Sequence, residues 1–154
     1  MNKAKLKKTL NRAEEHCREH GTRFTEKRKH ILQLLLQSEV PLSAYELATH
    51  YQSAFGETIP AMSVYRILDF LMAETLVHKL NSANKYTACE HITCDHQHEV
   101  PQFLICERCQ NVKEVGIEPS IIAALADEIE RAGYHLTQPQ IELHCLCERC
   151  FSAS

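Results

Sequence analysis

"PAMSVYRILDFLMAETLVHKLNSANKYTAC", residues 60–89, decides the fold, because it joins a helical pattern to a strand pattern. The apolar residues of its first half follow the i, i+3, i+4, i+7 spacing of a buried helix face: Val64, Ile67, Leu68 and Leu71. Pro60 suits the first turn of this helix, where a missing N–H is not needed. "LVHKL" and "KYTAC" flank the turn sequence "NSAN" and predict a hairpin. The stretch therefore predicts a helix followed directly by a two-stranded hairpin.

More helices are predicted upstream of this stretch. Residues 4–20 form a helical pattern that ends at Gly21, a residue suited to the left-handed position after a helix. Thr25 can cap a second helix, and "SAYE", with Ser43 and Glu46 three residues apart, is a capping box that opens a third. Helices followed by a hairpin in this order are typical of a winged helix-turn-helix domain.

Composition and charge indicate a cytoplasmic protein with two modules. No apolar run in the 154 residues is long enough to cross a membrane, and the basic N-terminus has no apolar stretch behind it to form a secretory signal. Residues 1–88 carry 13 Lys and Arg against 9 Asp and Glu, whereas residues 89–154 carry 4 against 11. The first part is therefore suited to approach a polyanion, and the second to hold cations.

The C-terminal part has the pattern of a small α/β domain. "FLIC" and "NVKEVGI" predict strands, "PSIIAALADEIERAG" predicts an amphipathic helix, and "QIELHCLC" predicts a final strand. The sequence thus predicts an α+β protein with a winged-helix domain over residues 1–88, a polar His-rich linker over 89–101, and a second domain over 102–154.

The motif "CERC" occurs twice, and the two copies predict a structural zinc site. A Cys-x-x-Cys turn presents two thiolates to one point, and two such turns supply the four ligands of tetrahedral Zn²⁺. Cysteine pairs in a reducing compartment bind metal more often than they form disulfides. The predicted ligands are Cys106, Cys109, Cys147 and Cys150. The alternative is two unrelated pairs with redox or packing roles.

A second group of metal-binding residue types lies around the hairpin, the linker and the first CERC strand. It consists of His78, Cys89, His91, Cys94, Asp95, His96, His98 and Glu114. Scattered His and Asp in a polar loop are often only solvated, but the neighbouring CERC favours a metal. A mixed N, S and O ligand set suits Zn²⁺, whereas a set without sulfur would suit Fe²⁺ or Mn²⁺ better.

The stretch of residues 60–89 also predicts a DNA recognition helix. Arg66 falls opposite the apolar face of the helix, with Ser63 and Tyr65 beside it, in the position from which a recognition helix contacts base edges. The alternative is a solvated surface arginine. Cations near the N-terminus could contact phosphates: Lys3, Lys5, Lys7, Lys8, Arg23, Lys27 and Arg28.

These motifs resemble those of the ferric uptake regulator family, and most closely those of its zinc uptake regulator branch. The motifs that carry the resemblance are "RFTEKRKHIL", "LSAYEL", "SVYRILDFLMAETLVHKLNSANKYTAC", "FLICERCQNVKE" and "IELHCLCERC". The resemblance runs from about Cys17 to Cys150. It departs from the family at Glu26, where proline is usual, and at Gln138, where the iron-binding branch has a histidine.

The resemblance implies a homodimer that binds a palindromic DNA operator through the winged-helix domain and dimerises through the C-terminal α/β domain. It implies two Zn²⁺ per chain, one structural and one sensory. The implied sensory ligands are His78, Cys89, His98 and Glu114, with His96 in place of His98 as the alternative. The implied DNA contacts are Tyr45, Tyr65 and Arg66.

The function expected from these features is a zinc-responsive repressor of zinc uptake genes. An iron, manganese or peroxide sensor of the same family is the alternative. A metalloenzyme is disfavoured, because no H-E-x-x-H or H-x-E…P-C-x-x-C pattern occurs in the sequence. A metal-storage protein would leave the exposed Arg66 and the capped helices without a role.

Overall fold

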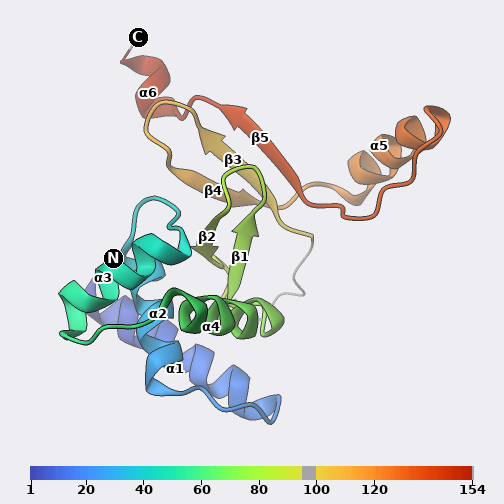
Figure 1. Ribbon diagram of the computed structural model, residues 1–154. Coiled ribbons are helices and arrows are strands. Elements are labelled where there is room, and N and C mark those ends of the chain that lie inside the picture. The colour runs from blue at the N-terminus through green and yellow to red at the C-terminus, as the bar shows by residue number, and fades with distance from the viewer. Residues whose placement is uncertain (95–99, 154) are drawn as a thin grey trace. The chain divides into compact units, whose positions relative to one another are not determined.

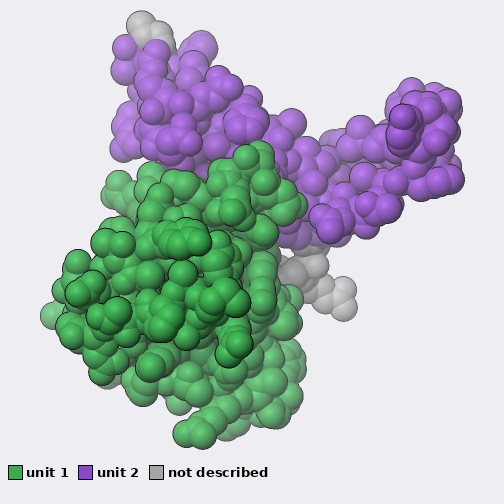
Figure 2. Space-filling view, in the orientation of Figure 1, with its two compact units in different colours: residues 1–95 green, residues 96–154 purple. Residues whose placement is uncertain are grey.

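The computed structural model describes residues 1–94 and 100–153. The chain divides into two compact units, residues 1–95 and 96–154, shown in different colours in Figure 2. The predicted linker ligands His96 and His98 lie outside the described residues. Within the described residues, no helix is both long enough and apolar enough to span a bilayer.

The first unit is a winged helix-turn-helix preceded by one long helix (Figure 1). Its elements are α1 (Lys3–Glu19), α2 (Glu26–Gln37), α3 (Ala44–Phe55), α4 (Ala61–Ala73), β1 (Val77–Leu80) and β2 (Lys85–Ala88). Strands β1 and β2 pair antiparallel, with Val77 opposite Ala88 and Leu80 opposite Lys85. This is the order of elements that the sequence predicted.

Local capping explains where these helices begin. The Thr25 hydroxyl accepts a hydrogen bond from the N–H of Arg28 at the start of α2. At the start of α3, the Ser43 hydroxyl accepts from the N–H of Glu46, and the Glu46 carboxylate accepts from the N–H of Ser43, so both bonds of the predicted capping box are present. Pro60 was predicted in the first turn of α4, but it occupies the N-cap, one position earlier.

The capping box gives a first testable prediction. Replacing Ser43 with alanine should lower the free energy of unfolding of the first unit by about 1 kcal/mol, because one N–H of the first turn loses its acceptor. Thermal or urea unfolding measures the difference. Ser53→Ala is the matched control, since Ser53 lies inside α3 and bonds only the carbonyl of Thr49. Equal losses in the two variants would show that the cap is not the cause.

The core of the first unit lies between α4 and the other helices. Within α4 the buried residues are Val64, Ile67, Leu68 and Leu71, the face predicted from the sequence. They belong to one cluster with residues of the other three helices, among them Leu10, Ile31, Leu47 and Tyr51. Burial on one face of α4 fixes which residues of the helix point to solvent, and so it positions Arg66.

The second unit is a three-stranded sheet with one long and one short helix. Its elements are β3 (Gln102–Cys106), β4 (Val112–Val115), α5 (Pro119–Arg131), β5 (Ile141–Cys145) and α6 (Glu148–Ser152). The strand order is β4-β3-β5, with β3 antiparallel to β4 and parallel to β5. The parallel pairing requires the long connection that contains α5. The short helix α6 was not predicted from the sequence.

Candidate functional site

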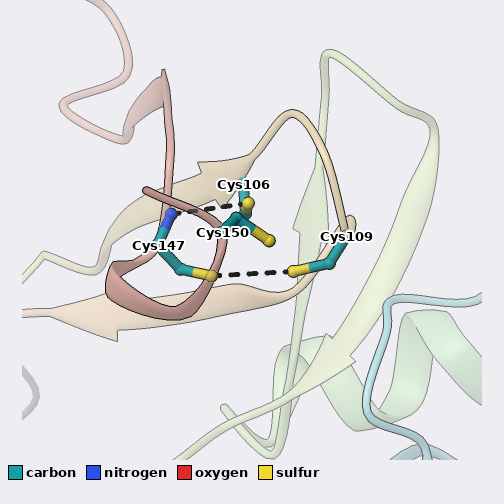
Figure 3. Close-up of side chains that lie close together, drawn as sticks. All are labelled: Cys106, Cys109, Cys147 and Cys150. Atoms are coloured by element: carbon teal, nitrogen blue, oxygen red, sulfur yellow. Dashed lines mark hydrogen bonds between the residues drawn. The ribbon is translucent and has the colours of Figure 1, made fainter. Parts of the chain in front are cut away.

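The two CERC motifs meet in the second unit (Figure 3). Cys106 ends β3 and Cys109 follows in the turn to β4, whereas Cys147 is the N-cap of α6 and Cys150 lies within that helix. All four side chains point toward a common centre, and their sulfur atoms lie within 4.8 Å of one another. The structure therefore brings together all four predicted structural ligands.

The sheet explains why motifs so far apart in sequence meet. Strands β3 and β5 run parallel with Cys106 opposite Cys145, so the two strands finish at the same end of the sheet, beside their Cys-x-x-Cys turns. The N–H of Glu107 donates to the carbonyl of Cys145 (2.9 Å). The Arg108 guanidinium donates to the carbonyl of Cys150 (2.7 Å) and so holds the second turn against the first.

The spacing of the sulfur atoms fits tetrahedral zinc. With Zn–S bonds of about 2.3 Å, the edges of the tetrahedron are about 3.8 Å long. The sulfurs of Cys109 and Cys147 are 3.8 Å apart. A set of four thiolates is also the ligand type of a closed structural zinc site, with no position left for substrate.

The electrostatics of the cluster favour a cation at its centre. Hydrogen bonds from the backbone N–H groups of Cys109 and Cys147 lower the pKa of Cys106 to about 6. Burial raises the pKa of Cys150 to about 12, and the thiols of Cys147 and Cys109 add to the rise. Cys106 therefore ionises readily, whereas burial and the neighbouring thiols disfavour the thiolate form of Cys150. A divalent cation at the centre of the cluster would stabilise that thiolate.

The predicted sensory ligands are in different units. His78 lies on β1 opposite Thr87, and Cys89 follows β2 in the first unit. The ligand atoms of His78 and Cys89 lie within 4.8 Å of each other. Cys89 is buried in the core cluster, and its sulfur accepts a hydrogen bond from the N–H of His91 (3.4 Å). Glu114 lies on β4 of the second unit, opposite Phe103.

The predicted DNA-contacting residues lie on the exposed side of α3 and α4. Arg66 is exposed on α4, opposite the buried face. Tyr45, in the first turn of α3, is 68% exposed, and its ring meets the edge of the Tyr65 ring at 6.3 Å between centroids. Ser63 lies in the first turn of α4, and its N–H donates to the carbonyl of Pro60. The helix-turn-helix therefore presents Tyr45 and Arg66 to solvent on adjacent helices, whereas Tyr65 is half-buried and packs against the core.

Arg23 and Arg28, predicted as phosphate contacts, differ in their surroundings. Arg23 is exposed. The Arg28 guanidinium lies over the Phe70 ring, 3.6 Å from its centroid, and donates a hydrogen bond to the carbonyl of Arg23. This contact joins the start of α2 to α4. Arg28 therefore has a structural role that the sequence did not show, because Phe70 is distant along the chain.

A second contact that the sequence did not predict joins the β1–β2 hairpin to α3. The ammonium of Lys85, at the start of β2, lies 3.0 Å from a carboxylate oxygen of Glu46 on α3. The hydrogen bond from Lys85 is the largest cause that lowers the pKa of Glu46. Leu42, just before α3, also pairs with Tyr86 of β2 through two backbone hydrogen bonds. The hairpin is thus attached to the helix that precedes α4.

Residues 19–144 match the model of the ferric uptake regulator family. The chain is 35% identical over 153 residues to the zinc uptake regulation protein of Escherichia coli (strain K12), an alignment that covers 97% of this chain and 85% of that protein.

Two solved structures resemble the chain over nearly its whole length. A zinc uptake regulator complexed with zinc and DNA has a TM-score of 0.81 at 29% identity, and the match covers 96% of each chain. The holo form of XcZur has a TM-score of 0.76 at 35% identity, and the match covers 93% of this chain and 96% of that chain.

Proposed function

This chain belongs to the ferric uptake regulator family, and on that premise we propose that it is a zinc-responsive, DNA-binding transcriptional repressor of zinc uptake genes. Membership of the family makes it a regulator and not an enzyme. The similarity to a zinc uptake regulator complexed with zinc and DNA supports both zinc and DNA as ligands. Its similarity to DNA-binding regulators also supports a cytoplasmic location.

One observation carries the choice of zinc over iron or manganese. The sulfur of Cys89 lies close to an imidazole nitrogen of His78, within 4.8 Å. A thiolate beside an imidazole is a soft and borderline pair, which suits Zn²⁺, whereas Fe²⁺ and Mn²⁺ sensors would be better served by nitrogen and oxygen alone. The proposed sensory set is His78, Cys89, His98 and Glu114, with His96 as the alternative to His98.

We assign two zinc ions to each chain. The first is held by Cys106, Cys109, Cys147 and Cys150, and it stabilises the second unit. The second is held by the sensory set and reports the zinc level. When zinc occupies the sensory site, the protein favours the form that binds the operator, because a bound ion shifts an equilibrium toward the form it binds better.

The proposal includes a homodimer formed through the second unit. Strand β5 is an edge strand, and its Leu143 is 48% exposed. Helix α5 has no buried residue. Other exposed large apolar residues of this unit are Val100, Ile121, Leu125, Tyr134, Leu136, Leu146 and Phe151. An uncovered edge with an apolar surface favours a partner, and a two-fold dimer matches a palindromic operator.

The sensory assignment is tested by replacing Cys89 with serine. The variant should keep its fold and its structural zinc but should need a higher free zinc concentration to bind DNA, since a hydroxyl is a much weaker zinc ligand than a thiolate. A gel-shift titration with buffered zinc measures the change.

Cys94→Ser is the matched control, because Cys94 is a neighbouring thiol outside the proposed set. The titration is repeated with Fe²⁺ and Mn²⁺. If Cys89→Ser has the same zinc dependence as the native protein, Cys89 is not a sensory ligand. If iron or manganese activates the native protein at lower concentration than zinc, the zinc assignment is wrong.

A further inference from the structure

A third group of metal-binding side chains lies wholly inside the first unit, apart from both proposed zinc sites. Two of its members are on α1: His16 in the last turn and His20 at the C-cap. A spacing of four residues places both imidazoles on one side of the helix, and their rings are 4.1 Å apart between centroids in an edge-on arrangement. The third member, Glu74, is the C-cap of α4.

The Glu74 carboxylate is buried between the ends of these helices. Glu74 is only 7% exposed, which is rare for a glutamate unless it is paired. Its Oε2 lies 3.0 Å from Nδ1 of His20 and 3.7 Å from Nε2 of His16. Burial raises the pKa of Glu74, but hydrogen bonds from His20 and Thr22 together with the nearby imidazoles more than offset it, so the net pKa is lowered and the carboxylate is ionised.

The hydrogen bond between His20 and Glu74 does not account for His16. The Nε2 atom of His16 is buried, and it has no hydrogen-bond partner among the described residues. A buried polar atom without a partner costs free energy, and in a native structure it often marks an ion or a water. Here the atom faces an ionised carboxylate at 3.7 Å, a separation that is too long for a hydrogen bond but suitable for two ligands of one cation.

We propose that His16, His20 and Glu74 bind a divalent metal ion, with Zn²⁺ as the expected cation. The ligand atoms of the three residues lie within 4.8 Å of one another. Ligands of tetrahedral zinc at bond lengths of about 2.1 Å are about 3.4 Å apart, so small side-chain rotations bring the three atoms to zinc distances. Two imidazoles and one carboxylate are a known zinc ligand set, and water can complete the tetrahedron.

A metal at this position would act on the DNA-binding unit directly. It would link the C-terminal end of α1 to the C-terminal end of α4, the helix that carries Arg66. A ligand that binds the folded unit alone stabilises that unit, and the stabilisation grows with the logarithm of the ligand concentration above the dissociation constant. The inference does not depend on the proposed sensory site, because it shares no residue with that site.

The test counts metal ions in the full-length chain with the Cys89→Ser substitution, so that the proposed sensory site is already weakened in the parent and in every variant compared with it. Each protein is dialysed against a series of buffered zinc concentrations. By elemental analysis, the Cys89→Ser chain that also carries His16→Ala and His20→Ala should hold one zinc fewer than the Cys89→Ser chain itself. His50→Ala, which removes an exposed histidine of α3, should lose none. Equal zinc content in the double variant and its parent at every zinc concentration would overturn the proposal.

Cobalt supplies a second reading that separates this site from the thiolate sites. In the Cys89→Ser chain, with the four-cysteine site first filled with zinc, added Co²⁺ should give the weak visible bands of nitrogen and oxygen ligation without thiolate charge-transfer absorption. Both Glu74→Gln and the double variant should lose these bands, and Glu74→Gln serves if the double variant does not fold. Bands that persist in Glu74→Gln would show that the carboxylate is not a ligand and would contradict the proposed site.

Discussion

Replacing Cys106 with serine should abolish the folded second unit and, with it, the proposed dimer. The four-cysteine cluster loses a thiolate, and the remaining three hold zinc far less tightly. Zinc binding at such sites is worth about 10–16 kcal/mol in model peptides and is coupled to folding.

The small core of the second unit makes this dependence severe. Among its described residues, the buried apolar side chains are Phe103, Ile105, Cys106 and Cys150. Two of these four are themselves zinc ligands in the proposal. A unit of this size with so little buried apolar surface usually needs a metal, disulfides or a partner to fold.

The measurement is zinc content per chain together with circular dichroism and the oligomeric mass in solution. Cys145→Ser is the control, since Cys145 lies on β5 beside the cluster and its sulfur contacts the carbonyl oxygens of Ile105 and Leu143. It should keep its zinc and its fold. A Cys106→Ser protein that remains a folded dimer with unchanged zinc content would refute the four-thiolate assignment.

Replacing Arg66 with alanine should remove most of the sequence specificity of DNA binding. A bidentate contact from arginine to guanine is worth about 1–3 kcal/mol of discrimination. The proposed dimer would present two copies of α4 to a palindrome whose half-site centres lie about one helical turn apart, so the total should be about 2–6 kcal/mol. The effect is expected because the buried face of α4 aims Arg66 at solvent on the opposite side.

The comparison is between a specific duplex and a scrambled duplex, at two salt concentrations with zinc present. Lys7→Ala is the better phosphate-contact control, since Lys7 is exposed, whereas Arg28 also packs on Phe70 and its loss would disturb α4. Lys7→Ala should weaken both duplexes alike and reduce the salt dependence. If Arg66→Ala also weakens both duplexes equally, Arg66 contacts only phosphate.

The sequence predicted the winged-helix unit well because its signals are local. The capping pair of Ser43 and Glu46, the glycine after α1 and the apolar spacing in α4 each act over a few residues. The same holds for each CERC turn. That the two CERC turns lie side by side could be inferred from the sequence only through zinc chemistry. The structure adds the cause, which is the parallel pairing of β3 and β5.

Contacts between distant residues could not be predicted in this way. His16 and His20 are spaced as neighbours on a helix, but nothing in the sequence connects them to Glu74, which lies 54 residues beyond His20. The stacking of Arg28 on Phe70 has the same origin. Helix α6 was missed because it spans only Glu148–Ser152 and begins at the metal-binding turn itself, where the thiol spacing hides any helical pattern.

The central claim is that zinc controls the binding of this protein to DNA. The direct test is a titration of the full-length protein, with its structural zinc retained, on duplexes selected from a random library in the presence of zinc. Fluorescence anisotropy at a series of buffered free zinc concentrations gives the affinity. We predict that affinity for the selected duplex rises steeply with free zinc while affinity for a scrambled duplex stays low. An affinity that is independent of free zinc across the whole series would contradict the claim.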